Sequence, residues 1–208
     1  MDLFLIRHGQ SEADLLDVHE GRADFQLTEL GMQQAKAMAE WMAGEYTLDR
    51  IYSSTLKRAR QTAAYLAEAC RLVPIFEPEL MERDNGLLAG VDHEEAERLY
   101  PQTKVLPVHR ALYNMEPLLD FRCRAERVLS RILEDSNGLK AIAIVSHGGM
   151  INRICHCLLR LPLESDAVFH TDDTGIHGWR LTEGRRSILF SNKTNHFQNN
   201  IFMNIETY

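Results

Sequence analysis

The segments LFLIRHG (residues 3–9) and AIAIVSHGG (residues 141–149) share one pattern: a short, mostly apolar run that leads into a histidine followed by glycine. Unbroken apolar runs of this length are typical of strands that are buried on both faces of a parallel sheet. Ligands of open parallel sheets bind beyond the carboxyl ends of the strands. If the two strands are neighbours, His8 and His147 meet at one edge of the sheet.

Outward from these two runs, segments with apolar residues at helical spacing alternate with further short strands. The pattern predicts helices at 28–42, 59–70, 125–132 and 151–159, strands at 50–54 and 72–77, and a hairpin over 178–191. This order predicts an α/β fold, a three-layer α/β/α sandwich with a mostly parallel central sheet and helices on both faces. Pro74 favours an edge position for its strand. Residues 84–120 are interpreted as an irregular insertion that forms a lid or a substrate wall.

The composition is that of an ordinary globular protein. The chain has 208 residues, 45% hydrophobic and 25% charged, which suits one domain spanning residues 1–208. A net charge of −7 without a Lys/Arg run argues against nucleic acid as a partner. No apolar stretch approaches the ~18 residues of a membrane span, and the N-terminus does not read as a signal peptide. Four cysteines without an export signal favour reduced thiols and a cytoplasmic location.

Charged and nucleophilic side chains follow several of the predicted strands. Arg7 precedes His8, Arg58 opens the helix after the strand at 50–54, and Glu82 follows the strand at 72–77. Arginines and imidazoles near helix N-termini form a cationic cup that suits a phosphate dianion. In such a cup one imidazole can attack phosphorus, and a carboxyl group can move a proton to the leaving oxygen. The sequence therefore indicates phosphoryl-transfer chemistry.

The chain resembles the histidine phosphatase superfamily, which has the phosphoglycerate mutase-like fold. The resemblance rests on five motifs in the family's order: LIRHGQSEAD (5–14), GRADFQLTELGMQQA (21–35), IYSSTLKRARQTA (51–63), LMERDNG (80–86) and VSHGGMI (145–151). By this resemblance His8 is the nucleophile and becomes a phosphohistidine. Arg7, Arg58 and His147 would bind the phosphoryl group, and Glu82 would be the proton donor. The resemblance implies neither a metal nor a cofactor.

The chain also departs from the family's pattern at several positions. These departures leave the residues for phosphoryl transfer intact and concern the substrate specificity. Asp14 stands where the family usually has a phosphate-contacting asparagine. Its carboxylate either faces the phosphate site or is a solvated group in the first turn of a helix. Arg22 and Gly21 are candidate substrate contacts in the loop that follows. The tryptophan-containing segment usual after the glutamate is replaced by Leu88-Ala89-Gly90.

Other reactive side chains have simpler interpretations. Cys155, His156 and Cys157 point in three directions if they lie on one helix, so core packing is favoured over a metal site. Arg60 lies two positions from Arg58 and should face away from the cup. Ser146 is interpreted as a strand-end residue, because no nucleophile-elbow motif surrounds it.

Three functions are compatible with these residues. The favoured one is a phosphomonoesterase acting on a small phosphorylated metabolite. The second is a cofactor-dependent phosphoglycerate mutase, although family mutases usually carry a basic insertion after the glutamate. Here the insertion contributes only Arg98, Lys104 and Arg110. The third is a non-catalytic binding relative whose site is impaired by Asp14. The oligomeric state and the identity of the substrate are not predicted.

Overall fold

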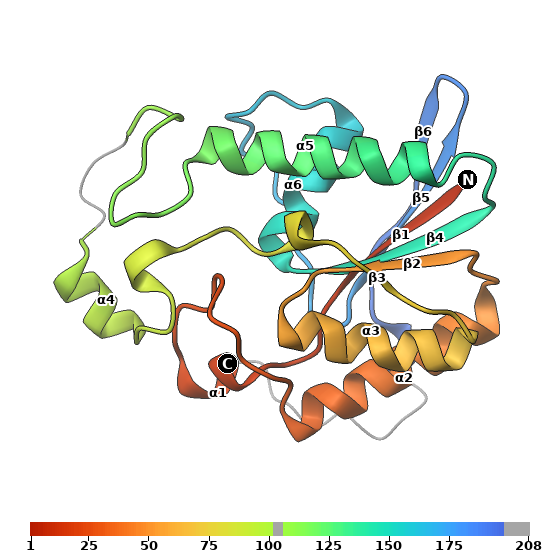
Figure 1. Cartoon of the computed structure of the whole chain (residues 1–208), viewed down its shortest axis with the longest axis horizontal. Coiled ribbons are helices and arrows are strands. Elements are labelled where there is room, and N and C mark those ends of the chain that lie inside the picture. The colour runs from red at the N-terminus through yellow and green to blue at the C-terminus, as the bar shows by residue number, and fades with distance from the viewer. Residues whose placement is uncertain (102–105, 198–208) are drawn as a thin grey trace.

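The computed structural model describes residues 1–101 and 106–197, and its centre is a six-stranded sheet in the order β3-β2-β4-β1-β5-β6 (Figure 1). The strands are β1 (Asp2–Arg7), β2 (Arg50–Ser53), β3 (Ile75–Phe76), β4 (Ala141–Ser146), β5 (Ile176–Thr182) and β6 (Arg185–Lys193). Neighbours among β3, β2, β4 and β1 are parallel, whereas β5 and β6 are antiparallel. The predicted mostly parallel sheet is confirmed.

The two strands that precede the histidines are neighbours in register. Arg7 of β1 lies opposite Ser146 of β4, so the residues that follow these strands emerge at the same edge. Side chains of β1 alternate between two cores: Leu3 and Leu5 pack on one face of the sheet, and Phe4 and Ile6 on the other. This two-sided burial explains the continuous apolar run, and the meeting of His8 and His147 follows from it.

Helices cover both faces, which confirms the predicted sandwich. On one face lie α2 (Glu29–Glu45) and α3 (Lys57–Cys70), and on the other α5 (Leu118–Asp135) and α6 (Gly148–Leu159) (Figure 1). Thr28 caps α2 because its hydroxyl accepts the Gly31 N–H at 2.9 Å. No helix of the described residues is long and apolar enough to cross a membrane.

Two predicted elements differ from the structure in their limits. The strand expected at 72–77 shrinks to two residues, Ile75 and Phe76, at the open edge of the sheet. Pro74 lacks the N–H that would extend the pairing. The terminal hairpin turns over Glu183 and Gly184 alone, and the positive φ of 73° at Gly184 suits this short turn.

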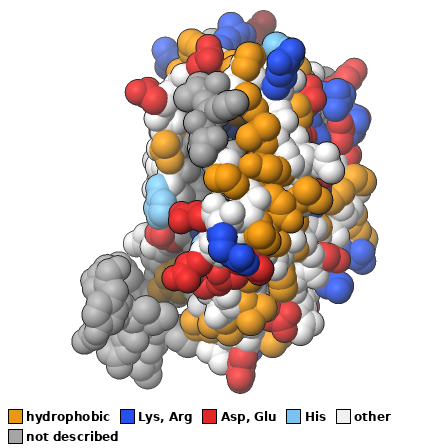
Figure 2. Space-filling model, turned by 90° about the vertical axis from the view of Figure 1, so that its left-hand side faces the viewer, with side chains coloured by type: hydrophobic (Ala, Val, Ile, Leu, Met, Phe, Trp, Pro, Cys, Tyr) orange, Lys and Arg blue, Asp and Glu red, His pale blue; other side chains and the backbone are white. Residues whose placement is uncertain are grey.

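The insertion and the loop after β1 lie together at one end of the molecule. They contain α1 (Glu12–Leu16), the 3-10 helix η2 (Gly86–Leu88) and α4 (His93–Leu99). Two further 3-10 helices lie outside them: η1 (Pro78–Leu80) follows β3, and η3 (Asn195–Phe197) follows β6. An antiparallel bridge between Val18 and Asp92 joins the two segments, and the Gly90 N–H donates to the His19 carbonyl at 2.7 Å. Figure 2 faces this end and shows hydrophobic side chains in a band between charged ones.

Candidate active site

His8 follows β1 and is almost completely buried, with 1% of its surface exposed. Its Nδ1 lies 2.8 Å from the Gly9 carbonyl oxygen, which only accepts hydrogen bonds, so Nδ1 carries the ring hydrogen. Nε2 is therefore free to act through its lone pair, and it accepts the Arg58 Nε–H at 3.2 Å. Burial lowers the pKa of His8 well below its usual value, and the charges of Arg58 and Arg7 add to this effect. The imidazole is thus neutral and nucleophilic.

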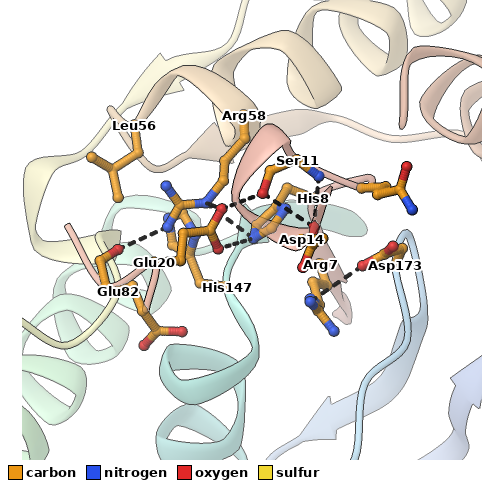
Figure 3. Close-up of polar contacts among 12 residues, drawn as sticks. Arg7, His8, Ser11, Asp14, Glu20, Leu56, Arg58, Glu82, His147 and Asp173 are labelled. Atoms are coloured by element: carbon orange, nitrogen blue, oxygen red, sulfur yellow. Dashed lines mark hydrogen bonds and ion pairs between the residues drawn. The ribbon is translucent and has the colours of Figure 1, made fainter. Parts of the chain in front are cut away.

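Arg58 is a fully buried cation near the start of α3. Its two terminal nitrogens donate to the Gly21 carbonyl at 2.8 Å and the Ala23 carbonyl at 2.9 Å, while Nε faces His8 (Figure 3). Burial lowers the pKa of the guanidinium, but the nearby Glu20 carboxylate opposes that shift. Held at three points, Arg58 presents a fixed positive charge beside the His8 ring.

His147 is the N-cap of α6, and its ring centroid lies 5.0 Å from that of His8. Nε2 lies 2.8 Å from the Ser54 hydroxyl, which also accepts the Leu56 N–H. Nδ1 is buried and has no partner among the described residues. Burial lowers the pKa of His147 well below its usual value, as do Arg58 and His8. If Ser54 donates to Nε2, the neutral ring keeps its hydrogen on Nδ1 as an unused donor.

Arg7 lies at the rim of the same edge. Its guanidinium donates to the Thr171 carbonyl at 2.8 Å and forms an ion pair with Asp173 at 3.2 Å (Figure 3). Burial raises the pKa of Asp173 to about 6, although the charge of Arg7 opposes the rise. The Asp173 carboxylate thus pairs with the positive charge of Arg7.

Glu82 reaches the site from the loop after η1. Its two carboxylate oxygens accept the Arg83 N–H at 2.7 Å and the Gly149 N–H, in the first turn of α6, at 2.8 Å. A Cβ at Gly149 would lie 2.5 Å from a Glu82 oxygen, so only glycine permits this approach. Glu82 lines a cavity of about 370 Å³ together with Glu20, Gly21, Gly149, Arg83 and Arg153. A substrate in this cavity would lie against the Glu82 side chain.

A buried arginine of α5 holds the backbone of this loop. Arg124 donates to the carbonyls of Glu79, Met81 and Glu82 at 2.7–3.0 Å. It also forms a bidentate ion pair with Glu116 at 2.7 and 2.8 Å, and both side chains are about 90% buried (8% and 11% exposed). One side chain therefore fixes the loop that carries Glu82.

Removing Arg124 is expected to destabilise the fold strongly. Arg124→Met removes the nearest cation from the buried Glu116 carboxylate, which keeps Arg22 at 3.7 Å and the Asp84 N–H at 3.2 Å, so the free energy of unfolding should fall by about 3 kcal/mol. The double variant Arg124→Met/Glu116→Gln should recover part of this loss, because it removes the unpaired charge. Urea unfolding measures both effects. A loss below about 1 kcal/mol in the single variant would contradict this role of the ion pair.

Glu20 is a site residue that the sequence analysis did not identify. One carboxylate oxygen lies 3.1 Å from Arg58 Nε and accepts the Ser11 hydroxyl at 2.5 Å, and the other lies 3.6 Å from His8 Nε2 (Figure 3). Burial raises the pKa of Glu20, and Arg58 opposes the rise. The carboxylate therefore lies beside the ring nitrogen of His8 that also faces Arg58. In the sequence its neighbours Gly21 and Arg22 drew attention, but no local pattern shows that Glu20 folds back onto α3.

The structure also places the three remaining site candidates, Asp14, Arg22 and Gly21. Asp14 is exposed and accepts the Ser11 N–H at 2.7 Å in a capping box of α1. Arg22 pairs with Asp84 at 3.4 Å, and its Nε donates to the Glu82 carbonyl at 3.3 Å. Gly21 has a positive φ of 49°, lines the cavity and binds Arg58 through its carbonyl. Substrate contacts of these three residues stay predictions.

The residues with simpler interpretations do not line the cavity beside Glu82. Cys155 and Cys157 are buried free thiols, and the His156 Nε2 lies 2.7 Å from the Ala167 carbonyl. No cluster of the described residues could hold a metal ion. Arg60 lies over the Phe76 ring at 4.5 Å, and the Ser146 hydroxyl donates to the Leu80 carbonyl at 2.7 Å.

Comparisons with known proteins show the family of the chain. The family model of the histidine phosphatase superfamily (branch 1) matches residues 3–194. The chain is 31% identical over 198 residues to phosphoserine phosphatase 1 of Hydrogenobacter thermophilus, covering 93% of each chain. It is 32% identical to the adenosylcobalamin/alpha-ribazole phosphatase of Salmonella typhimurium, over 79% of this chain and 83% of the relative.

A solved structure resembles the whole architecture. The alpha-ribazole phosphatase of Shigella flexneri superposes with a TM-score of 0.82 at 25% identity, over 93% of this chain and 97% of that one. The fold, the motifs and these relatives agree with one another. The chain therefore belongs to the histidine phosphatase superfamily (branch 1) and is a phosphoric monoester hydrolase.

Proposed function

We propose that the chain hydrolyses small phosphomonoesters through a phosphohistidine formed on Nε2 of His8. The observation that carries the proposal is the state of His8: Nδ1 donates to the Gly9 carbonyl, and Nε2 presents its lone pair beside Arg58. Because its pKa lies well below the usual value, the ring stays neutral in mildly acidic solution. A neutral imidazole fixed next to a guanidinium is an activated nucleophile facing an anion site.

In the first step Nε2 attacks phosphorus. The N–P bond forms while the bond between phosphorus and the ester oxygen breaks, and the leaving oxygen takes a proton from the Glu82 carboxyl group. Arg58, Arg7 and the Nδ1–H of His147 stabilise the charge on the three equatorial oxygens. The products of this step are the free alcohol and the phosphohistidine.

In the second step water attacks the phosphohistidine. The Glu82 carboxylate takes a proton from the water as the N–P bond breaks, so that inorganic phosphate leaves and the Glu82 carboxyl group is restored. The unshared electron pair returns to His8 Nε2, and the ring is again neutral. No metal takes part in either step.

The mutase alternative differs only in the acceptor of the phosphoryl group, which is a substrate hydroxyl instead of water. Within the insertion, Arg98 contacts Glu95 at 3.4 Å, and Lys104 lies outside the described residues. An assay of 3-phosphoglycerate conversion beside an assay of phosphate release separates the two reactions. We expect phosphate release to dominate.

Release of nitrophenolate from p-nitrophenyl phosphate tests the proposal against the non-catalytic alternative. That alternative requires Asp14 to disable the site, but its carboxylate is held by the Ser11 N–H in the cap of α1. The purified protein should release nitrophenolate without added metal and with a chelator present. If folded protein shows no release and no phosphorylated intermediate, the non-catalytic alternative holds.

Removing the charge of Glu20 is expected to tighten phosphate binding. The carboxylate lies 3.6 Å from the nucleophilic nitrogen of His8, where it repels an incoming dianion. Glu20→Gln keeps the shape and removes the charge, so the Kd for inorganic phosphate at pH 8 should fall by about tenfold or more. This gain in phosphate affinity should shrink as the pH falls. Because the pKa of Glu20 is raised, the wild-type carboxyl group takes up a proton as the solution becomes acidic and loses the charge that the variant lacks.

Glu12→Gln is the matched control for this change. Glu12 lies in the first turn of α1 and accepts the Gln26 side-chain N–H at 2.8 Å, so the variant loses the same charge outside the site. Its phosphate affinity should stay within about twofold of wild type, since exposed charges are screened. Isothermal titration calorimetry measures both variants. Unchanged or weaker phosphate binding in Glu20→Gln would show that the carboxylate does not compete with phosphate.

A further inference from the structure

Asp173 lies in a turn that hydrogen bonds attach to the segment carrying the nucleophile. The turn precedes β5, and the Thr174 N–H donates to the His8 carbonyl at 3.1 Å. The Arg7 N–H donates to the Gly175 carbonyl, also at 3.1 Å. Thr174 is buried and has a positive φ of 52°, a backbone conformation that its surroundings must hold. The turn therefore keeps Asp173 beside Arg7 and His8.

The side chains of Asp173 and Arg7 form an ion pair at the rim of the candidate active site (Figure 3). Asp173 Oδ1 lies 3.2 Å from Arg7 Nη2, and the two side chains are 23% and 25% exposed. The other terminal nitrogen of Arg7 donates to the Thr171 carbonyl at 2.8 Å. Two partners from one segment thus hold both terminal nitrogens of the guanidinium, which restricts its orientation.

The charge of Arg7 acts on both histidines of the site. It lowers the pKa of His8 and of His147, in each case in addition to the larger effect of burial. A Cβ at Gly148, the residue after His147, would lie 3.9 Å from Arg7 Cδ, so the arginine lies beside the start of α6. A negative charge on Asp173 therefore offsets part of the positive potential that Arg7 creates where a phosphate dianion would bind.

Groups from several elements act on the Asp173 carboxyl group. Burial raises its pKa to about 6, and the carboxylates of Asp14 and Asp172 add to the rise. The charge of Arg7 and a hydrogen bond from Gln34 of α2 oppose the rise. The carboxyl group is therefore charged above about pH 6 and neutral below it.

Other titratable groups near the turn make contacts of their own. Asp172 lies 2.8 Å from a ring nitrogen of His170. The His196 ring contacts the Thr174 hydroxyl at 2.9 Å, and burial lowers the pKa of this ring to about 4, so it is neutral where Asp173 titrates. Neither contact involves the Asp173 carboxylate.

We propose that Asp173 is a positioning residue that holds Arg7 in place and, while charged, weakens the binding of inorganic phosphate to the site. Phosphate is the product of the proposed reaction, so the charged carboxylate favours its release. Once the carboxyl group is neutral, the Arg7 charge is unopposed and the site binds phosphate more tightly. This role rests on the proposed function, because it takes Arg7 as a ligand of the phosphoryl group. It differs from that of Glu20, which lies beside Arg58 and His8 Nε2.

Phosphate binding to Asp173→Asn at two pH values tests this role. Asparagine keeps an oxygen that can accept the Arg7 N–H, but it removes the charge. Titration calorimetry should give a Kd for inorganic phosphate about tenfold lower than that of wild type at pH 8, and within about twofold of it at pH 5. The difference disappears in acid because the wild-type carboxyl group, with its pKa of about 6, is then protonated. The ionisations of phosphate and of Glu20 are common to both proteins and cancel in the ratio.

Asp172→Asn is the matched control. It removes the same charge from the neighbouring, exposed aspartate, so its Kd should stay within about twofold of wild type at both pH values. Asp173→Ala tests the positioning part of the role, because it removes the oxygen that holds Arg7 together with the charge. Its kcat for phosphomonoesters should fall at least about threefold further than that of Asp173→Asn, since the guanidinium is then less well oriented.

A measurement on the unaltered chain makes the test independent of how the variants fold. Binding linkage is reciprocal: if protonation of Asp173 tightens phosphate binding about tenfold, saturating phosphate raises the pKa of Asp173 by about one pH unit. NMR titration of the ¹³C-labelled carboxyl group, with and without inorganic phosphate, measures this change. An unchanged pKa overturns the proposal.

The results also distinguish the role of Asp173 from the proposed function. A ratio of Kd values that is the same at pH 5 and pH 8, or no phosphate binding by either protein, overturns the role of Asp173. Turnover of p-nitrophenyl phosphate in that case leaves the phosphatase intact. A ratio that changes with pH as expected supports the role even if the protein turns over no phosphomonoester, and the failure then belongs to the proposed function alone.

Discussion

Replacing His8 by alanine is expected to lower kcat for every phosphomonoester by about 10⁴-fold or more, because the covalent route is lost with its nucleophile. The fold should survive. Arg58 keeps its bonds to the Gly21 and Ala23 carbonyls and its ion pair with Glu20, so no buried charge loses its partner. Circular dichroism and thermal unfolding check the fold, and steady-state assays with alkyl and aryl phosphates check the rate.

A second buried histidine provides the matched control. His156 lies on α6 with its ring against the Ala167 carbonyl, away from the phosphoryl site. His156→Gln should lower stability while turnover per folded molecule stays within about threefold of wild type, since packing defects act mainly on the folded fraction. If His8→Ala retains turnover near the level of His156→Gln, His8 is not the nucleophile.

Replacing Glu82 by glutamine is expected to slow phosphorylation by substrates with poor leaving groups far more than by substrates with good ones. An alkoxide needs a proton as it leaves, whereas nitrophenolate scarcely does, so phosphorylation by alkyl phosphates should slow by about 100-fold or more. The side chain keeps its place, because a glutamine oxygen can still accept the Gly149 N–H that holds Glu82. Rapid-quench measurement of the phosphorylation step on both substrate types gives the ratio.

Glu79 offers a neighbouring carboxylate for comparison. It lies in η1 and pairs with Arg127 at 2.6 Å and Arg131 at 3.0 Å, on the outside of the same loop. Glu79→Gln should slow both substrate types equally and by less than about threefold. An equal loss on alkyl and aryl phosphates in Glu82→Gln would assign Glu82 an electrostatic role and leave the proton donor to be found among the other groups of the cavity.

The sequence predicted those parts of the molecule that depend on short segments. The run AIAIVS forms β4 at its expected limits, Ala141–Ser146. All six residues are buried, so the strand has no solvent-exposed face, and the apolar run coincides with it. The adjacency of β1 and β4, and with it the meeting of His8 and His147, follows from the parallel arrangement. The strand around Pro74 was predicted too long, because only Ile75 and Phe76 pair with β2 and Pro74 lacks an N–H to extend the pairing.

The parts that sequence reasoning missed are made by contacts between distant segments. Glu20 reaches His8 only because the loop after α1 folds back onto α3. Arg124 acts on Glu82 from the middle of an amphipathic helix, where its sequence neighbours give no sign of its burial. Arg83 and Arg153 line the same cavity although they lie far apart in the sequence. Such contacts depend on packing, which no periodicity encodes.

Mapping the phosphoryl group on the trapped intermediate tests the role of His8 directly. The protein is mixed briefly with a phosphomonoester, quenched in base, digested and analysed by mass spectrometry and ³¹P NMR. Since Nδ1 of His8 donates its hydrogen to the Gly9 carbonyl, we expect phosphorylation of Nε2 in the peptide that contains His8, and none in the His8→Ala variant. A phosphoryl group on Nδ1, on His147 or on any other side chain would contradict it.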